Sequence, residues 1–251
     1  MLPAERRRLI LERLRRDGRV VAAELGGSLG VSHDTVRRDL QDLAEAGLLQ
    51  RVHGGALPPV TLAPSFAARR RDAPAAKLAL ARAGANLIRP GQVVILDAGT
   101  TNERLASELP PELEATIFTN APPVAIALAR QPHIDVHLLG GRLDKAGLAA
   151  VGSATVAAVR DVRADVCVLG ICSVHPGLGI SGDDSEEAYL KRAMIESAAD
   201  VVGLATADKL GTSSPFVIAP PTELTHLIVD RAATEEAVAP YEAIGITVVR
   251  A

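Results

Sequence analysis

The sequence predicts an α/β protein with two parts: a small, mainly helical N-terminal part and a larger C-terminal part. Three observations lead to this fold class. The chain has 251 residues, a length typical of about two domains. The first sixty residues contain short amphipathic helical patterns, and from residue 75 onward apolar runs alternate with helical patterns. Apolar strands that alternate with helices are typical of a mainly parallel sheet covered on both faces. We therefore divide the chain into residues 1–57, a linker at 58–74, and residues 75–251.

The composition narrows the class of protein. Hydrophobic residues make up 48% of the chain and aromatic residues only 2%, so the core must be aliphatic. No apolar run reaches the roughly 18 residues of a membrane span, and no apolar segment follows the N-terminal charges as in a signal peptide. The two cysteines, Cys167 and Cys172, have no histidine nearby at zinc-site spacing. We expect a cytoplasmic protein with reduced core thiols, no membrane contact, no metal and no cofactor.

The net charge of −3 is unevenly distributed along the chain. The first sixty residues carry ten arginines against eight acidic residues, and the remainder carries 17 basic against 22 acidic residues. A modest basic excess in the small part fits contact with nucleic acid there. The acidic remainder argues against a protein that binds DNA through charge alone.

The N-terminal part begins with two expected helices. Residues 3–16 form the first, with an apolar stripe of Ile10, Leu11 and Leu14, and arginines such as Arg6 cover its other faces. Gly18 suits the left-handed position that ends a helix. After a short β-like stretch, residues 22–29 form a second helix, although Gly26-Gly27 is unfavourable within it. Gly30-Val31 is then a tight turn.

The third expected helix covers residues 32–43. Ser32 is a good N-cap, and the apolar face consists of Val36, Leu40 and Leu43. The other faces carry His33, Asp34, Arg37, Arg38 and Gln41. Two adjacent arginines on such a helix suit insertion into a DNA major groove, whereas the alternative is an ordinary solvated surface helix. The order helix, short helix, turn, helix is the helix-turn-helix arrangement.

A hairpin is expected after the third helix. Gly47 ends that helix, and residues 48–57 read as two short strands around a turn at Gly54-Gly55. Arg51 and His53 on this wing are placed to touch a phosphate backbone or the minor groove.

Two motifs in this part resemble a known family. Val31-Ser32-x-x-Thr35-Val36-Arg37-Arg38-Asp39-Leu40, followed by Gly47-x-x-x-Arg51-x-His53-Gly54-Gly55-Ala56, is similar to the winged helix-turn-helix of the DeoR family of bacterial transcription regulators. The resemblance implies a double-stranded DNA operator as partner.

The hydrogen-bonding groups of bases and phosphates indicate which residues of this part should contact DNA. Arginine can pair with guanine N7 and O6 or with phosphates, and the residues at the helix start are the other groove candidates. We expect Asp39 to hold an arginine in place, because a carboxylate would repel phosphate. The predicted DNA-binding residues are Ser32, His33, Thr35, Arg37, Arg38, Arg51 and His53.

Prolines mark the linker at positions 58, 59, 64 and 74. The stretch Arg69-Arg70-Arg71 reads as a solvated charge cluster or as an additional phosphate contact. Beyond it, expected strands lie at 93–96, 116–118, 136–139, 166–169, 201–204, 227–229 and 246–249. Expected helices lie at 77–88, 102–109, 124–130, 154–159, 186–198 and 234–241.

The strand ends carry the candidate ligand site. In parallel sheets ligands bind beyond the carboxyl ends of the strands, and small residues before a helix N-terminus suit an anion. An ordinary strand–helix turn is the alternative at each loop. Lys209 is the obvious cation for a phosphate. The candidates, in chain order, are Asp97, Gly99, Thr100, Thr101, Thr119, Asn120, Gly140, Gly141, Gly170, Asp208 and Lys209.

This half resembles the DeoR effector domain. The matching pieces are Asp97-x-Gly99-Thr100-Thr101, Thr119-Asn120, Leu139-Gly140-Gly141, Val151-Gly152, Glu187-Ala188-x-x-Lys191-Arg192-x-Met194 and Asp208-Lys209, with Arg69 and Lys77 also at family positions. The resemblance implies a fold similar to ribose-5-phosphate isomerase and glucosamine-6-phosphate deaminase. It also implies a phosphorylated sugar or related effector, and it adds Lys191 to the site.

The expected function is regulation of transcription. We predict a repressor of carbohydrate-metabolism genes that acts as a homodimer or homotetramer, since one helix-turn-helix contacts one half-site; activation stays open. The alternative is a sugar-phosphate isomerase or deaminase fused to a DNA-binding domain. The acidic strand-end motif of such isomerases is absent from residues 169–173, and His175 reads as a loop residue, so we predict no catalytic residues.

Overall fold

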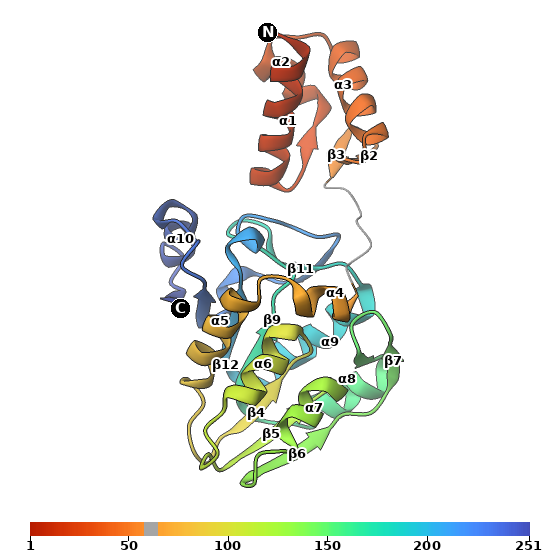
Figure 1. Cartoon of the computed structure of the whole chain (residues 1–251). Helices are drawn as coiled ribbons and strands as arrows, with labels where there is room; N and C mark the ends of the chain where they lie inside the picture. Colours follow the sequence, from red (N-terminus) through yellow and green to blue (C-terminus); the bar gives the residue numbers. More distant parts are fainter. Residues whose placement is uncertain (58–64) are drawn as a thin grey trace.

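The computed structural model describes residues 1–57 and 65–251 (Figure 1). Three of the prolines that mark the predicted linker, at positions 58, 59 and 64, lie outside the described residues. The two parts of the chain have separate cores and are described in turn.

The N-terminal part is a helix-turn-helix with a wing. Its elements are α1 (Pro3–Asp17), β1 (Val20–Val21), α2 (Ala22–Leu29), α3 (His33–Glu45), β2 (Gln50–Val52) and β3 (Gly55–Leu57). The three strands form an antiparallel sheet in the order β1-β3-β2. Ile10, Leu25, Val36 and Leu40 are buried between the helices. The predicted elements of this part are confirmed.

Local residue choice explains the sharp start of α3. Ser32 accepts a hydrogen bond from the backbone N–H of Thr35, as an N-cap residue should. Gly30 has a φ of 64°, which permits the turn between α2 and α3 without the strain that a side chain would cause.

The C-terminal part is built on a seven-stranded sheet in the order β15-β14-β12-β9-β4-β5-β6. All neighbouring strands pair in parallel. The strands are β4 (Val93–Leu96), β5 (Ala115–Thr119), β6 (Ile134–Leu138), β9 (Ala164–Gly170), β12 (Ala198–Ala205), β14 (His226–Val229) and β15 (Thr247–Arg250). Each corresponds to an expected strand, so the parallel α/β class is confirmed.

Helices cover both faces of this sheet, and two aliphatic clusters fill the layers between. Side chains that alternate along one strand enter different clusters: Ile95 belongs to one, Val94 and Leu96 to the other. The helices are α5 (Pro74–Ala85), α6 (Thr100–Glu108), α7 (Pro122–Leu128), α8 (Ser153–Arg160), α9 (Ser185–Glu196) and α10 (Glu235–Glu242).

Some elements were not expected from the sequence. They are the hairpin β7 (Arg142–Asp144) and β8 (Ala149–Val151), the antiparallel sheet of β10 (Ser173–His175), β11 (Gly179–Gly182) and β13 (Phe216–Ala219), and the short helices η1 (Ala207–Lys209) and η2 (Pro221–Glu223). His175, predicted to be in a loop, ends β10.

Helix α4 (Phe66–Arg71) lies inside the stretch predicted as a linker. Its Phe66 is buried, so this half of the stretch packs as structure instead of acting as an open connector. The arginine triplet occupies the last turn of α4, not a helix start.

Two further sequence expectations concern cysteines and membranes. Cys167 is buried and Cys172 partly buried, and both are free thiols. Across residues 1–57 and 65–251, no helix combines the length and the apolarity needed to cross a bilayer.

Candidate functional site

The polar side chains of α3 face solvent. Ser32, His33, Arg37 and Arg38 are exposed, and Thr35 is partly buried. The Arg37 guanidinium lies 3.9 Å from the carboxylate of Asp34 one turn earlier, a weak exposed pair. The face opposite to these residues is the apolar stripe that packs into the core. The helix therefore presents its arginines outward on a rigid support.

Asp39 is a buried clamp between α3 and α1. Its carboxylate accepts hydrogen bonds from the guanidinium groups of Arg6 and Arg7. The hydrogen bond to Asp39 raises the pKa of Arg6. The expectation that Asp39 holds an arginine is confirmed. Arg6 lies outside the apolar stripe of α1, as expected, but it is only 8% exposed and pairs with Asp39.

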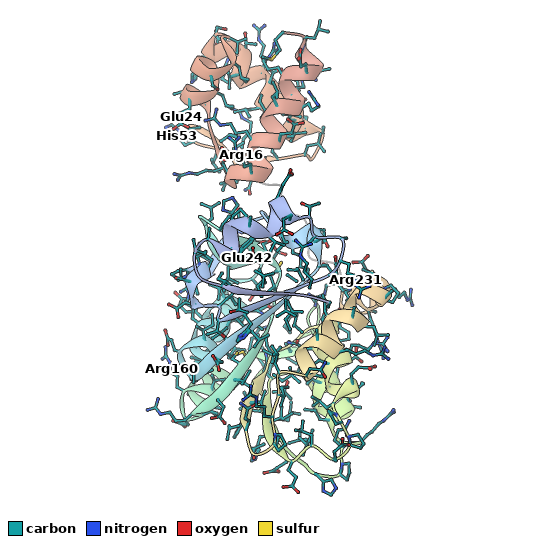
Figure 2. All side chains as sticks on the ribbon, turned by 90° about the vertical axis from the view of Figure 1, so that its left-hand side faces the viewer. Arg16, Glu24, His53, Arg160, Arg231 and Glu242 are labelled. Atoms are coloured by element: carbon teal, nitrogen blue, oxygen red, sulfur yellow. The ribbon has the colours of Figure 1, made fainter. Side chains whose placement is uncertain are left out.

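The wing is tied to both neighbouring helices. The Arg51 guanidinium donates to the side-chain oxygen of Gln41 on α3. The backbone N–H of Ala22, at the start of α2, donates to the carbonyl of Gly54 at the wing turn over 2.8 Å. Figure 2 shows His53 of the wing on the same side of the N-terminal part as Glu24 of α2. His53 and Arg51 are both exposed.

Asp97 is at the centre of the strand-end site. It follows β4 and is 1% exposed. Its Oδ2 atom accepts hydrogen bonds from the Lys191 ammonium and, over 3.0 Å, from the backbone N–H of Gly170 at the end of β9. A Cβ on Gly170 would lie 2.4 Å from the carbonyl oxygen of Ala98, so only glycine allows the two strand ends to lie this close. The predicted association of Asp97, Gly170 and Lys191 is present.

Asn102 belongs to the same cluster and was not predicted. Its side-chain nitrogen donates to the carbonyls of Asp97 over 2.8 Å and Val168 over 3.2 Å. The remaining oxygens, Oδ1 of Asp97 and Oδ1 of Asn102, are buried and have no hydrogen-bond partner among the described residues. Next to them, Gly99, Thr100 and Thr101 form the start of α6.

Lys209 lies in η1 and is partly buried. Its ammonium donates to the carbonyl of Ile171, just beyond β9, over 2.6 Å. Burial lowers the pKa of Lys209, and the nearby cations Lys77 and Arg69 lower it further against the opposing effect of Cys172 and Asp208. The predicted cation is therefore beside the end of β9, with Asp208 next to it.

Lys77 and Arg69 were outside the predicted site, although they lie near it. Lys77 on α5 is 7% exposed, and its ammonium donates to the backbone carbonyl of Arg69 on α4. Burial lowers the pKa of Lys77, and the charge on Arg69 adds to this against Asp72 and Asp208. Neither residue follows a strand, so the strand-end rule did not place them in the site, although both stand at positions where the family has similar residues.

Of the predicted residues at the ends of β5 and β6, Asn120 bonds the β7–β8 hairpin and Gly140 bonds α8. The side chain of Asn120 donates to the carbonyl of Ala150 over 3.1 Å, while its Oδ1 atom is buried without a hydrogen-bond partner in the described part of the chain. Thr119 is buried, and its hydroxyl accepts from Ala121. Gly140 accepts from the Thr155 hydroxyl over 2.7 Å, and a Cβ on Gly141 would collide with that hydroxyl. These four positions shape one side of the strand ends.

The carboxylates around α9 have structural partners. Asp184 caps the helix by accepting from the backbone N–H of Glu187 over 2.8 Å. Glu186 pairs with Arg142, and Asp183 accepts from the Cys172 thiol. Burial raises the pKa of that thiol, with Asp183 adding to the effect, so the thiol is not activated as a nucleophile.

The fold can also be compared with solved structures. Ribose 5-phosphate isomerase A from Methanocaldococcus jannaschii aligns with 53% of this chain and 52% of that chain, at 16% sequence identity and a TM-score of 0.39. A score this low carries no argument about a shared fold or activity, so the expected likeness to that enzyme adds nothing beyond the observed topology.

Sequence comparisons cover both parts of the chain. The family described as "DeoR-like helix-turn-helix domain" matches residues 6–59, and the "DeoR C terminal sensor domain" matches residues 72–231.

Individual relatives match over almost the full length. "HTH-type transcriptional regulator GlpR" of Haloferax volcanii is 34% identical over 99% of this chain and 98% of that protein. "HTH-type transcriptional repressor GlcR" of Bacillus subtilis is 33% identical over 92% of this chain and 90% of its own length. "Glycerol-3-phosphate regulon repressor" of Escherichia coli is 32% identical over 85% of each. The chain belongs to the DeoR family of transcriptional regulators.

Proposed function

We propose that this protein is a sequence-specific DNA-binding repressor of carbohydrate-metabolism genes, controlled by a phosphorylated sugar or related metabolite. The N-terminal part binds the operator through α3 and the wing, and the C-terminal part binds the effector at the strand ends. Ser32, His33, Thr35, Arg37, Arg38, Arg51 and His53 are the proposed DNA contacts. A regulator of this kind works in the cytoplasm as a homodimer or homotetramer, because an operator offers paired half-sites.

The observation that carries the effector proposal is the pairing of two kinds of group at the strand ends. Lysine ammonium groups of lowered pKa, Lys77 and Lys209, call for an anion such as phosphate. The buried oxygens Oδ1 of Asp97 and Oδ1 of Asn102 have no donor among the described residues and call for hydroxyl groups. A sugar phosphate carries both.

The proposal also holds that the chain is not an enzyme. Two carboxylates near the strand ends have structural partners: Oδ2 of Asp97 accepts from Lys191 and Gly170, and Asp184 accepts from the first turn of α9. A general base needs a free, positioned group of suitable pKa.

A footprint on the DNA upstream of the chain's own gene tests the proposal. We expect a protected, sequence-specific site at moderate salt, and a change in its affinity when one member of a panel of sugar phosphates is added. Arg38→Ala is expected to weaken protection, and Arg160→Ala on the exposed surface of the C-terminal part (Figure 2) is the matched control. Absence of any sequence-specific protection would overturn the proposal.

A further inference from the structure

Two aromatic side chains are exposed on the C-terminal part. The chain has three Phe, two Tyr and no Trp. Phe66 and Tyr241 are buried, and Phe118 is partly buried. By contrast, Tyr189 on α9 is 63% exposed, and Phe216 at the start of β13 is 40% exposed. Both exposed rings therefore belong to two elements, α9 and β13, that pack against each other.

The side chain of Arg192 connects these two elements. Its guanidinium carbon lies over the Tyr189 ring, 5.1 Å from the ring centre. The same guanidinium donates to the carbonyl of Val217 and, over 3.0 Å, to the carbonyl of Ile218 on β13. The Val217 side chain is 52% exposed and follows Phe216 in the chain. One continuous surface, which we call the α9–β13 patch, is thus formed by Tyr189, Arg192, Phe216 and Val217.

The composition of the α9–β13 patch is typical of the centre of a protein–protein interface. Tyr, Phe and Arg are enriched in such centres, and Tyr and Arg often carry much of the binding energy. β13 is an edge strand of its sheet, which could in principle accept a further strand. However, the carbonyls of Val217 and Ile218 already accept from Arg192, so the patch offers side chains to a partner instead of a free strand edge.

The charges along α9 favour a second copy of this chain as the partner. Glu186 lies three residues before Tyr189, and Arg192 lies three residues after it, so all three are neighbours on the surface of the helix. Both charged side chains are partly exposed. A two-fold axis through Tyr189 sets two α9 helices antiparallel, so each Glu186 faces Arg192 of the partner subunit. The surface is thus complementary to itself, and one acid with one base gives no net charge to attract a strongly charged partner.

We propose that the α9–β13 patch is the apolar centre of a two-fold interface between two copies of this chain. The inference rests on the proposed function for the need of two copies at paired half-sites, and it adds the surface that joins them. A stable interface buries about 800 Å² per partner, so neighbouring parts of α9 and of the small antiparallel sheet supply its rim. Lys191, on the buried side of α9, pairs with Asp97, so the strand-end clusters of the two copies lie on helices that touch.

Analytical ultracentrifugation of the full chain without DNA, from nanomolar to micromolar concentration, tests the inference. The wild type is expected to dimerise. Tyr189→Ala removes the central ring and should weaken the dimer at least about thirtyfold, and Val217→Ser at least about fivefold. Ile126→Ala, on the 67% exposed side chain of α7, is the matched control and should change the dissociation constant less than about twofold.

Charge reversal tests the antiparallel pairing of the two helices. Glu186→Lys places an ammonium opposite Arg192 of the partner subunit, so the dimer should weaken at least about fivefold, and high salt should reduce this loss. Glu236→Lys is the matched control, because it makes the same change on an exposed side chain in the first turn of α10. Both changes put a cation at a helix N-terminus, so that cost within the chain is common to both.

Cysteine cross-linking locates the contact directly. The two-fold axis brings position 189 of the two copies together, so Tyr189→Cys should give a disulfide-linked dimer under mild oxidation, whereas Ile126→Cys should not. Because the chain's own thiols are buried or partly buried, the oxidised wild type provides the background. Circular dichroism melts verify that each variant is folded.

Each contrary result overturns the inference. A wild type that stays monomeric at its highest soluble concentration would reject the interface. Dimer affinity unchanged in both Tyr189→Ala and Val217→Ser, or a cross-link at position 126 but not at 189, would place the contact on another surface. Unchanged affinity in Glu186→Lys would reject the antiparallel pairing of α9. A dimer that depends on the patch, together with a failed DNA footprint, would reject the operator proposal and leave this inference standing.

Discussion

The Asp97 carboxylate and the Lys191 ammonium form an ion pair in which the two side chains are 1% and 2% exposed. Lys191 also donates to the carbonyl of Gly170 over 2.7 Å and lies 3.2 Å from Glu187. Burial alone would lower the pKa of Lys191, but Asp97 and Glu187 more than offset it, so the pKa lies above its ordinary value. Lys191 is thus a satisfied cation, and the proposed function assigns the anion to Lys209 and Lys77.

Breaking this pair should destabilise the C-terminal part strongly. Asp97→Asn leaves the Lys191 charge buried with Glu187 as its remaining carboxylate partner, and a neutral amide oxygen replaces the carboxylate that accepts from Lys191 and Gly170. We expect a loss of about 3–5 kcal/mol in unfolding free energy, measured by urea denaturation. Glu187→Gln, at the more exposed end of the network, should cost no more than about 1 kcal/mol. Equal effects of the two changes would contradict this description.

Asp39→Asn should weaken operator binding without removing a DNA contact. The change breaks the link between α1 and α3, so the recognition helix is held less firmly. Thermal melts should show a lower midpoint for the N-terminal transition, and gel-shift titrations a weaker affinity. Asp42→Asn is the control, because Asp42 pairs with Arg7 on the exposed surface. If both variants bind DNA equally well, the clamp does not support recognition.

Salt titration of operator affinity separates the roles of the exposed arginines. A residue that contacts only phosphate should, when replaced by alanine, reduce the slope of log affinity against log salt by about 1 and weaken all sequences alike. A residue that reads a base should relax specificity at one operator position, at about 1–3 kcal/mol. We expect Arg38→Ala to show the second behaviour and Arg51→Ala the first. The reverse pattern would exchange the roles of α3 and the wing.

Anion binding should weaken with rising pH before an ordinary lysine titrates at about 10.4. Burial and neighbouring cations lower the pKa of Lys77 and Lys209, so they lose protons first. Between the lowered and the ordinary pKa, the unfolded state binds more protons, so the free energy of unfolding should rise with pH. Sulfate, which does not titrate in this range, is the probe for calorimetry. Lys209→Met should flatten both profiles, and an unchanged profile would contradict the assignment.

The sequence is sufficient to predict the parallel sheet, because its strands are buried on both faces and read as continuous apolar runs such as Val93–Leu96. The short hairpin strands β7 and β8 lack that signal, since three residues establish no period. Helix α4 was not predicted from the sequence, because the prolines around it favour a linker.

Long-range pairing limits prediction of the site. Nothing local in the sequence relates Arg6 to Asp39, which are 33 residues apart, or Lys191 to Asp97, 94 residues apart. The rule that ligands bind beyond the carboxyl ends of parallel strands selects Asp97, Gly170 and Lys209, because the topology brings these strand ends together. It overlooks Lys77 and Arg69, since helices that precede the first strand of the sheet reach the same place only through tertiary packing.

The crowding of cations around Lys77 has an effect on how this protein responds to mutation. Burial, with a smaller effect of the neighbouring cations, disfavours the charged form of Lys77 and Lys209, so neutral replacements at either position should remove an unfavourable contribution to folding. Stability and responsiveness therefore compete at these positions. A laboratory selection for heat resistance would enrich variants that survive well and no longer sense their metabolite.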